Sequence, residues 1–144
     1  PDQTVITDMT KHTLFELVRT YQAFSASSEV FVRQFDLTPA QFDVIATLGQ
    51  TPGMNTGEIG ERTLITKGTL TGVIDRLEKK GLVQREVPAE DRRSVVVKLT
   101  AEGQAVFNRA FPAQVADLER RFGQLEASEL ELLRVLLSRL RRVF

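Results

Sequence analysis

Cysteine is absent from the chain, and histidine occurs once, at His12. Without cysteine the protein has no disulfide, no thiol redox sensor, no cysteine nucleophile and no cysteine-bound zinc. A single histidine also excludes a metal site built from several histidines of one chain. The acidic residues do not have the spacing of metal ligands. The sequence also shows no set of a nucleophile, a base and an orienting group. We therefore expect no enzymatic activity, no catalytic residues, no metal and no cofactor.

Long apolar runs are absent as well. No segment approaches the ~18 apolar residues that span a membrane, and no secretory signal is visible. The 144 residues have the usual size of one domain or compact subunit, and 42% of them are hydrophobic and 26% charged, as in ordinary folded proteins. We expect a cytoplasmic protein without a membrane partner.

The formal net charge is zero, which by itself argues weakly against a nucleic-acid partner. The charge is unevenly distributed, however. Residues 61–99 contain nine lysines or arginines and six acidic residues, a net charge of +3, and the rest of the chain carries −3. The positive segment includes the arginines of "PAEDRRSVVVKLT" (88–100). Such a cluster is explained either by plain solvent exposure or by contact with an anion.

Both ends of the chain carry apolar stripes at helical spacing. Residues 8–35 are predicted to form one long helix, whose 3-4 seam is broken only at a serine (Leu14, Leu17, Tyr21, Phe24, Ser28, Phe31 and Phe35). The last helix, in "ASELELLRVLLSRLRRVF", repeats that spacing (Leu130, Leu133, Leu137, Leu140 and Phe144). We favour a homodimer over packing within one chain, because both ends would otherwise expose long apolar faces.

The central part contains helix caps and turns. "LTPAQF" carries a capping box of Thr38 and Gln41, and the helix that it starts ends near Gly49. "NTGEIGERT" predicts a short helix, and "ITKGTLTGVIDRLEKKG" predicts another, capped by Thr66 and closed by Gly81. Two short helices joined by a tight turn form a candidate helix-turn-helix.

A β-hairpin follows these helices. "LVQREV" (82–87) and "SVVVKL" (94–99) predict two strands around a polar tip, and Thr100 caps the next helix. The expected fold class is mainly α with a small β-hairpin, in the order of four helices, two strands and two helices. We expect three regions: an N-terminal helix (1–36), a helix-turn-helix region with the hairpin (37–100) and C-terminal helices (101–144).

The second short helix separates into two faces on a helical wheel. Its apolar residues share one side (Leu70, Val73, Ile74 and Leu77), and Gly68, Gly72, Asp75 and Lys79 lie opposite. A small, polar first turn suits a helix that enters the major groove of DNA, although Thr-rich segments with glycine also form ordinary weak surface helices. Asp75 would repel phosphate unless it pairs with Lys79 or accepts a hydrogen bond from a cytosine amino group.

The segment "TKGTLTGVIDRLEKKGLVQREVPAEDRRSVVVKLTAEG" resembles the core of the multiple-antibiotic-resistance regulator (MarR) family of winged helix-turn-helix transcription factors. The resemblance lies in R-L-E-x-x-G-L-V, the wing motif D-x-R and the closing L-T-x-x-G, in that order. The family layout is also matched by the long first helix, by "LTPAQFDVIATL" and by the last two helices. The resemblance therefore covers nearly the whole chain. The lack of cysteine departs from the peroxide-sensing branch, and Glu126 stands where many members have a Ser or Thr cap.

The resemblance implies a homodimeric regulator, a repressor of a pseudo-palindromic operator, with terminal helices that form the dimer and a hairpin that forms the wing. Carried over, Arg93 enters the minor groove, Asp91 orients an arginine side chain, and Arg92 and Arg76 meet phosphate. The complete set of expected DNA-binding residues is Thr66, Lys67, Gly68, Thr69, Thr71, Arg76, Asp91, Arg92 and Arg93.

Family members often bind small aromatic ligands, frequently phenols, in a cleft between the dimerisation and DNA-binding regions. The resemblance therefore makes His12, Tyr21, Phe31 and Phe35 candidate ligand-binding residues, although aromatic stripes at helical spacing more often form a core or a dimer seam. The alternative function is a helical protein–protein adaptor without specific DNA binding. That alternative fits the zero net charge and leaves the arginine-tipped hairpin unexplained.

Overall fold

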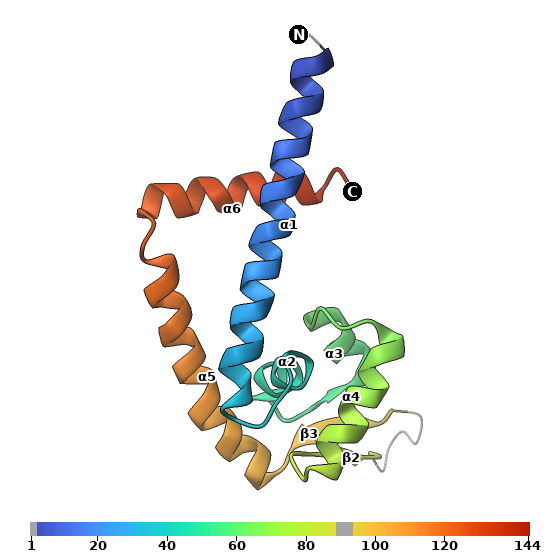
Figure 1. The fold of residues 1–144 in the computed structure, drawn as a ribbon. Helices are drawn as coiled ribbons and strands as arrows, with labels where there is room; N and C mark the ends of the chain where they lie inside the picture. Colours follow the sequence, from blue (N-terminus) through green and yellow to red (C-terminus); the bar gives the residue numbers. More distant parts are fainter. Residues whose placement is uncertain (1–2, 89–93) are drawn as a thin grey trace. The chain divides into compact units, whose positions relative to one another are not determined.

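The computed structural model describes residues 3–88 and 94–144 (Figure 1). Its elements are α1 (Gln3–Arg33), α2 (Pro39–Leu48), β1 (Met54–Asn55), α3 (Thr56–Arg62), α4 (Lys67–Lys79), β2 (Val83–Glu86), β3 (Val96–Leu99), α5 (Ala101–Phe122) and α6 (Ala127–Arg141). The predicted fold class is confirmed: the chain is mainly helical with a small antiparallel sheet. It divides into two compact units, residues 1–107 and residues 108–144, which are described separately below.

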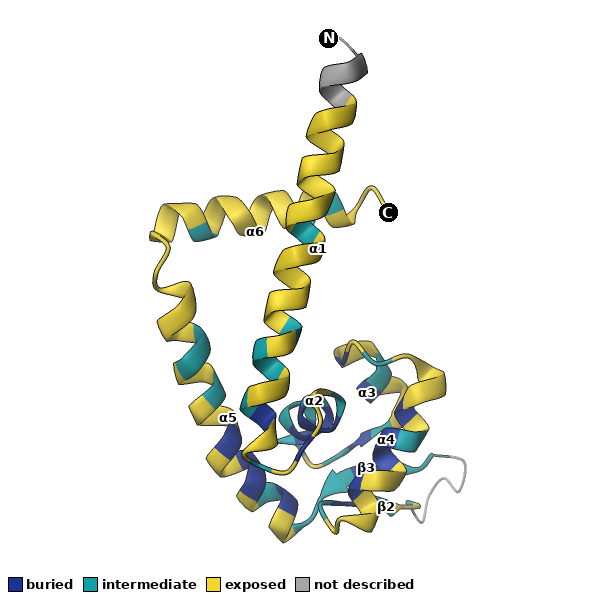
Figure 2. Cartoon of the chain, in the orientation of Figure 1, coloured by how far each residue is buried: buried dark blue, intermediate teal, exposed yellow. Residues whose placement is uncertain are grey.

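The long first helix is α1, which ends at Arg33 in a left-handed turn. Asp36 has a φ of 57°, its N–H donates to the carbonyl of Arg33 at 2.9 Å, and the N–H of Leu37 donates to the carbonyl of Val32 at 3.3 Å. This pair of bonds is a Schellman closure, with aspartate in the position that glycine usually takes. Figure 2 shows that most of α1 is exposed and that its buried part lies near this end.

The core of the first unit lies between α2, α4 and the sheet. Its most buried side chains come from every element around it (Val32, Val44, Ile45, Leu48, Ile59, Ile74, Leu77, Val83 and Val97). The predicted capping box at the start of α2 is confirmed, since the Gln41 N–H donates to Thr38 Oγ1 and the Thr38 N–H donates to Gln41 Oε1, both at 3.2 Å. This cap fixes where α2 begins and brings Gln41 into the interior.

The sheet has three strands in the order β1-β3-β2, all antiparallel. The hairpin prediction is confirmed for β2 and β3, which pair Val83 with Leu99 and Arg85 with Val97. The tip, residues 89–93, lies outside the described residues. The third strand, β1, is a difference from the prediction: it has only two residues and pairs with β3 through Met54 and Val97. A two-residue strand shows no alternating pattern, so only its pairing partner defines it.

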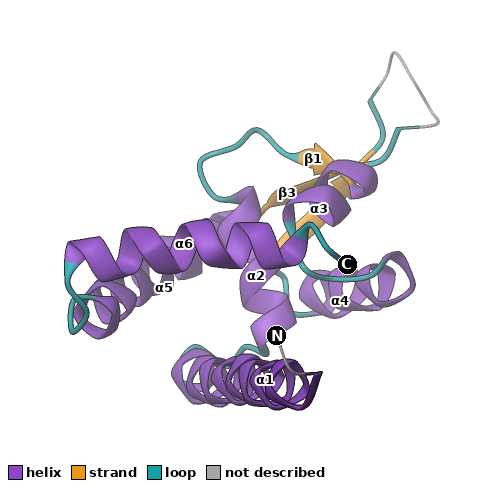
Figure 3. Cartoon of the chain, turned by 90° about the horizontal axis from the view of Figure 1, so that it is seen from above, coloured by secondary structure: helices purple, strands orange, loops and turns teal. Residues whose placement is uncertain are grey.

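Two contacts join the region of the sheet and α2, whose ribbons Figure 3 shows from above, to the first turns of α5. Thr100 is the predicted cap: its hydroxyl accepts the N–H of Gly103 at 3.0 Å and donates to the carbonyl of Gly81 at 2.6 Å. At the end of α2, a Cβ on Gly49 would lie 2.0 Å from the ring of Phe107. The backbone of α2 therefore touches an aromatic ring of α5 directly, and this contact requires glycine.

The second unit contains the rest of α5 and α6. Asp117 pairs with Arg120 and with Arg121, and these arginines lower the pKa of its carboxyl, chiefly through the hydrogen bond from Arg121. At the start of α6 the N–H of Glu126 donates to Glu129 Oε1 at 2.9 Å. No residue of α6 is buried, and its apolar side chains are largely exposed (Leu132, Leu133, Val135, Leu136 and Leu137).

Candidate nucleic-acid interface

Helix α4 presents a polar face on the surface of the first unit. Its apolar face is buried as the wheel predicts (Leu70, Val73, Ile74 and Leu77). The residues of its opening turn are exposed (Thr66, Lys67, Gly68, Thr69 and Thr71). Because the first N–H groups of a helix have no partner within the helix, this end presents backbone donors together with hydroxyls and one ammonium group.

The cap of α4 differs in detail from the prediction. Thr66 is the N-cap residue, but its side chain makes no capping hydrogen bond to the helix backbone. Its hydroxyl instead donates to Thr69 Oγ1 at 3.1 Å. The two hydroxyls therefore lie side by side on the surface and remain able to bond an external group.

Within the part of the chain that the structure describes, no packing contact requires either glycine of α4. A Cβ on Gly68 would meet nothing within 4 Å, and a Cβ on Gly72 would lie 3.7 Å from Nη1 of Arg76, an ordinary contact. Glycine inside a helix costs about 1 kcal/mol relative to alanine. Because the two glycines have no side chains, they leave a stretch of helix backbone that a ligand can approach closely.

The acidic residues on the outward side of α4 are paired with the wing strand. Arg85 of β2 donates to Asp75 Oδ1 at 2.6 Å through Nη2 and to Glu78 Oε1 at 3.0 Å through Nη1. Asp75 thus pairs with Arg85, and not with Lys79, which was one of the two alternatives that the sequence left open. The charge that would repel phosphate is largely compensated by an arginine ten residues away in sequence.

The turn between α3 and α4 is attached to α2. Asp43 of α2 accepts the N–H of Leu64 at 3.3 Å, and Thr63 donates its hydroxyl to the carbonyl of Ile59 at 2.9 Å. Burial raises the pKa of the Asp43 carboxyl, and the hydrogen bond from Leu64 partly opposes that shift. These bonds hold the turn while the Leu64 side chain stays 91% exposed at the surface.

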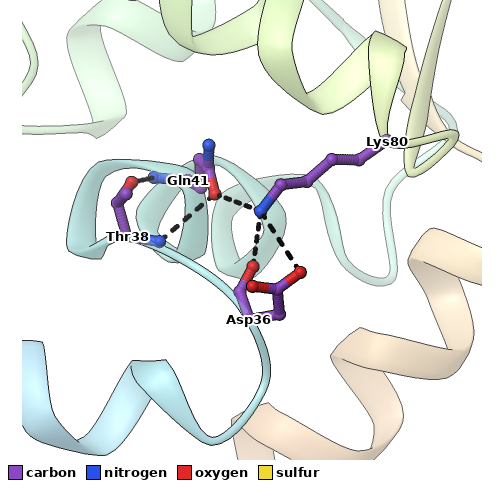
Figure 4. Close-up of polar contacts among 4 residues, drawn as sticks. All are labelled: Asp36, Thr38, Gln41 and Lys80. Atoms are coloured by element: carbon purple, nitrogen blue, oxygen red, sulfur yellow. Dashed lines mark hydrogen bonds and ion pairs between the residues drawn. The ribbon is translucent and has the colours of Figure 1, made fainter.

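The C-terminal end of α4 is attached to the junction of α1 and α2 through Lys80, which follows the helix (Figure 4). Lys80 Nζ donates to the backbone carbonyl of Asp36 at 2.5 Å and to Gln41 Oε1 at 3.1 Å, and it lies 4.0 Å from Asp36 Oδ2. A shallow, open surface pocket of about 150 Å³ adjoins this cluster and is lined by Arg33, Asp36, Leu37, Thr38 and Lys80. Sequence reasoning missed the cluster, because its members are up to 44 residues apart.

The predicted wing residues Asp91, Arg92 and Arg93 lie outside the described residues. The predicted phosphate-binding residue Arg76 is exposed on α4. The predicted DNA-binding residues within the described part of the chain therefore all belong to α4 and its cap.

The four candidate ligand-binding residues separate into two groups along α1. Phe31 and Phe35 are half-buried, with ring centroids 5.6 Å apart, whereas His12 and Tyr21 are exposed. At 1.5 Å per residue, His12 lies roughly 28 Å along the helix from Phe31. Within one chain, a small ligand that contacts Phe31 cannot also touch His12.

Among the described residues, no helix has the length and apolar character needed to cross a membrane. Nor does that part of the chain bring together three or more histidine, cysteine, aspartate or glutamate side chains that could hold a metal ion.

The fold and the exposed helix together define a winged helix-turn-helix protein. The sequence model of the MarR family matches residues 37–95. The homoprotocatechuate degradative operon repressor of Escherichia coli is 35% identical over 109 residues, which are 74% of this chain and 71% of that protein. The chain therefore belongs to the MarR family, whose members are transcription regulators.

Solved structures agree with this assignment. A probable transcriptional regulator from Pseudomonas aeruginosa superimposes with a TM-score of 0.71 at 31% identity, over 88% of this chain and 94% of that one. NadR, solved in complex with 4-hydroxyphenylacetate, superimposes with a TM-score of 0.70 at 27% identity, over 90% of this chain and 92% of that one. The resemblance read from the motifs is thus confirmed for the family and for the fold.

Proposed function

We propose that the chain is a sequence-specific DNA-binding repressor that acts as a homodimer on a pseudo-palindromic operator. The observation that carries this proposal is the exposed polar opening turn of α4, a helix whose later turns are paired with the β2–β3 hairpin through Arg85. In this proposal the chain has three regions: a dimerisation helix (1–36), a DNA-binding winged helix-turn-helix (37–100) and C-terminal dimerisation helices (101–144). A regulator of this kind works where the chromosome lies, so the proposal includes a cytoplasmic location and no catalytic activity.

The proposed DNA contacts divide into two kinds. Thr66, Lys67, Thr69 and Thr71 line the end of α4 that reads the major groove, and Gly68 allows the helix backbone to approach it. Arg76 and Arg92 bind phosphate, which supplies affinity without sequence choice. Arg93 enters the minor groove, with Asp91 orienting an arginine, and there it reads groove width.

Two exposed apolar faces support the proposed dimer. On α1 the exposed apolar side chains include Met9, Leu14, Phe15, Val18, Tyr21 and Phe24, each between 44% and 64% exposed. On α6 they include Leu132, Leu133, Leu136 and Leu137, each between 45% and 59% exposed. Isolated apolar residues on a surface are common, but continuous faces of this length mark an interface.

A small aromatic acid is the proposed effector. NadR was solved with 4-hydroxyphenylacetate, and the Escherichia coli relative is named for homoprotocatechuate degradation. Phe31 and Phe35 form the aromatic pair on which such a ring could stack, and His12 and Tyr21 join the site only if another surface brings them to it. A thermal-shift series of aromatic acids tests this part, because a ligand that prefers the folded state raises the unfolding temperature.

The DNA proposal is tested by fluorescence anisotropy with duplexes taken from the DNA that flanks the coding region. We expect an inverted repeat in that DNA to be bound more tightly than scrambled duplex, with affinity falling steeply as salt rises. Arg93→Ala should weaken operator binding by tenfold or more, since a well-placed base or groove contact is worth about 1–3 kcal/mol.

Arg134→Ala is the matched control, because it removes the same charge from a residue paired with Glu131 in α6. It should leave operator binding unchanged. Wild-type protein that binds neither duplex, or binds both without salt dependence, would favour the helical adaptor instead.

A further inference from the structure

The contacts of Lys80 differ from those of an ordinary surface lysine. Its side chain is 34% exposed, and its ammonium group bonds both a backbone carbonyl and a buried amide. Asp36, which supplies the carbonyl, has a left-handed backbone at the end of α1. Gln41, which supplies the amide oxygen, is only 4% exposed and also accepts the N–H of Thr38. Lys80 is thus directed to a defined position rather than into solvent.

The cluster joins three helices at their ends. Asp36 follows α1, Gln41 belongs to the first turn of α2, and Lys80 follows α4. One ammonium group therefore connects the end of α4, the proposed recognition helix, to the end of α1, the proposed dimerisation helix, as Figure 4 shows. A charge-assisted bond to a partly buried acceptor is stronger and more directional than a bond between neutral groups.

We propose that Lys80 is a positioning residue: it fixes the direction of α4 relative to α1 and thereby the separation of the two recognition helices in the dimer. This proposal rests on the proposed function, because it concerns a DNA-bound homodimer. Lys80 acts through Asp36 and Gln41 and touches no DNA. Since a dimer reads two half-sites at a fixed spacing along the duplex, a change in the direction of α4 alters which spacing fits.

Lys79 provides a matched control within the same turn. It is exposed on the polar side of α4, and no ion pair links it to another described residue. Lys79→Met and Lys80→Met remove the same charge from neighbouring positions, and methionine retains most of the apolar stem. A purely electrostatic contribution to DNA binding would therefore be similar in the two variants, whereas a positioning role belongs to Lys80 alone.

The first experiment measures the separation of the recognition helices without DNA. Because the chain has no cysteine, Thr71→Cys introduces one attachment point for a spin label per protomer. Pulsed electron resonance on the labelled dimer then reports one distance between the two α4 helices. We expect a single narrow distribution for the parent and for Lys79→Met, a shifted or broadened one for Lys80→Met, and recovery in Lys80→Arg.

The second experiment measures operator spacing by anisotropy. The matched operator is compared with one that carries an extra base pair between its half-sites. We expect Lys79→Met to weaken binding to both duplexes by the same factor. Lys80→Met should reduce the preference for the matched operator by about 2- to 30-fold, the range found when residues between coupled sites are changed.

The outcomes separate this proposal from the proposed function. If the parent dimer binds the operator and Lys80→Met keeps both the distance distribution and the spacing preference of Lys79→Met, Lys80 does not position α4. If the parent gives no distance between protomers, the homodimer fails and the positioning proposal fails with it. A general loss of stability is recognised by thermal unfolding, and in that case Lys80→Arg must restore both readouts for the proposal to stand.

Discussion

Arg85 connects the wing to the recognition helix through a single side chain. Its two terminal nitrogens hold Asp75 and Glu78, and its own side chain is 28% exposed. Ion pairs this close to solvent contribute about 0–1 kcal/mol to stability. The two ion pairs of Arg85 should affect the free energy of DNA binding more than that of folding. Without the arginine, two carboxylates of α4 would face phosphate uncompensated.

We predict that Arg85→Ala weakens operator binding by about tenfold, equivalent to ~1.4 kcal/mol, while the free energy of unfolding changes by no more than about 1 kcal/mol. Adding Asp75→Asn to Arg85→Ala should recover part of the lost affinity, because one of the two repelling charges is then removed. Anisotropy titrations over a range of salt concentrations measure the affinities, and chemical denaturation measures stability.

Lys98→Ala is the control for this prediction. It removes the same charge from the same hairpin, where Lys98 lies 2.6 Å from Glu86, and uncovers no carboxylate of α4. If the double variant Arg85→Ala/Asp75→Asn binds the operator as weakly as Arg85→Ala alone, Arg85 contacts DNA itself rather than compensating Asp75.

The contact between helices α2 and α5 depends on a missing side chain. Gly49 ends α2, and its backbone lies against the buried ring of Phe107 in the first turns of α5. The φ of Gly49 is −57°, so any residue could adopt its backbone conformation. The requirement for glycine at this position is therefore one of space alone.

We predict that Gly49→Ala destabilises the fold by about 1–3 kcal/mol, the usual cost of excess volume in a packed interior. Gly60→Ala is the matched control in α3, since a Cβ there would lie 3.8 Å from Leu70, an ordinary contact. It should be neutral or stabilise by up to about 1 kcal/mol, because alanine favours the helix. Denaturant unfolding measures both variants. Equal stabilities would show that Phe107 moves aside at little cost.

At the scale of elements, the sequence correctly predicted those helix boundaries and helix faces that depend on residues close together in the chain. The box of Thr38 and Gln41 located the start of α2, and the wheel of α4 separated its buried and exposed faces correctly. These features depend on residues three or four positions apart. The strand β1 was missed because two residues carry no period, and only their pairing with Val96 and Val97, more than forty residues later, makes them a strand.

The side-chain contacts of the candidate interface were less predictable for the same reason. Asp75 had a lysine at the favourable spacing of four residues, yet it pairs with Arg85, which folding brings closer. Lys80 finds Asp36 and Gln41 only because α1, α2 and α4 end near one another. Spacing along a helix does not predict contacts between elements that meet only in the folded chain.

At the scale of the whole molecule, the exposed faces of α1 and α6 govern assembly. We predict that Leu137→Asp in α6 weakens the dimer by at least tenfold, since burial of a leucine contributes about 1.5–3 kcal/mol. In a two-fold dimer each substitution also occurs twice. Light scattering coupled to size exclusion over a dilution series measures the dissociation.

Ser128→Asp is the control for the dimer prediction, because it adds the same charge at the first turn of α6, where a negative charge suits the helix dipole. It should leave the dimer intact. Operator affinity should fall together with dimerisation in Leu137→Asp, because two linked half-sites are bound more tightly than either one. A monomeric wild-type protein at micromolar concentration would contradict the assignment of these faces.

The sheet affects assembly in another way, through its two edges. One edge is the two-residue β1, and the other is β2, whose Gln84, Arg85 and Glu86 carry polar or charged side chains. Short, charged edge strands offer little backbone to a foreign strand. Edge-to-edge growth of the sheets into aggregates is therefore disfavoured. Before it dimerises, the chain exposes large apolar surfaces on its helices. Its sheet nevertheless adds little risk of fibril formation, because both edge strands are short or charged.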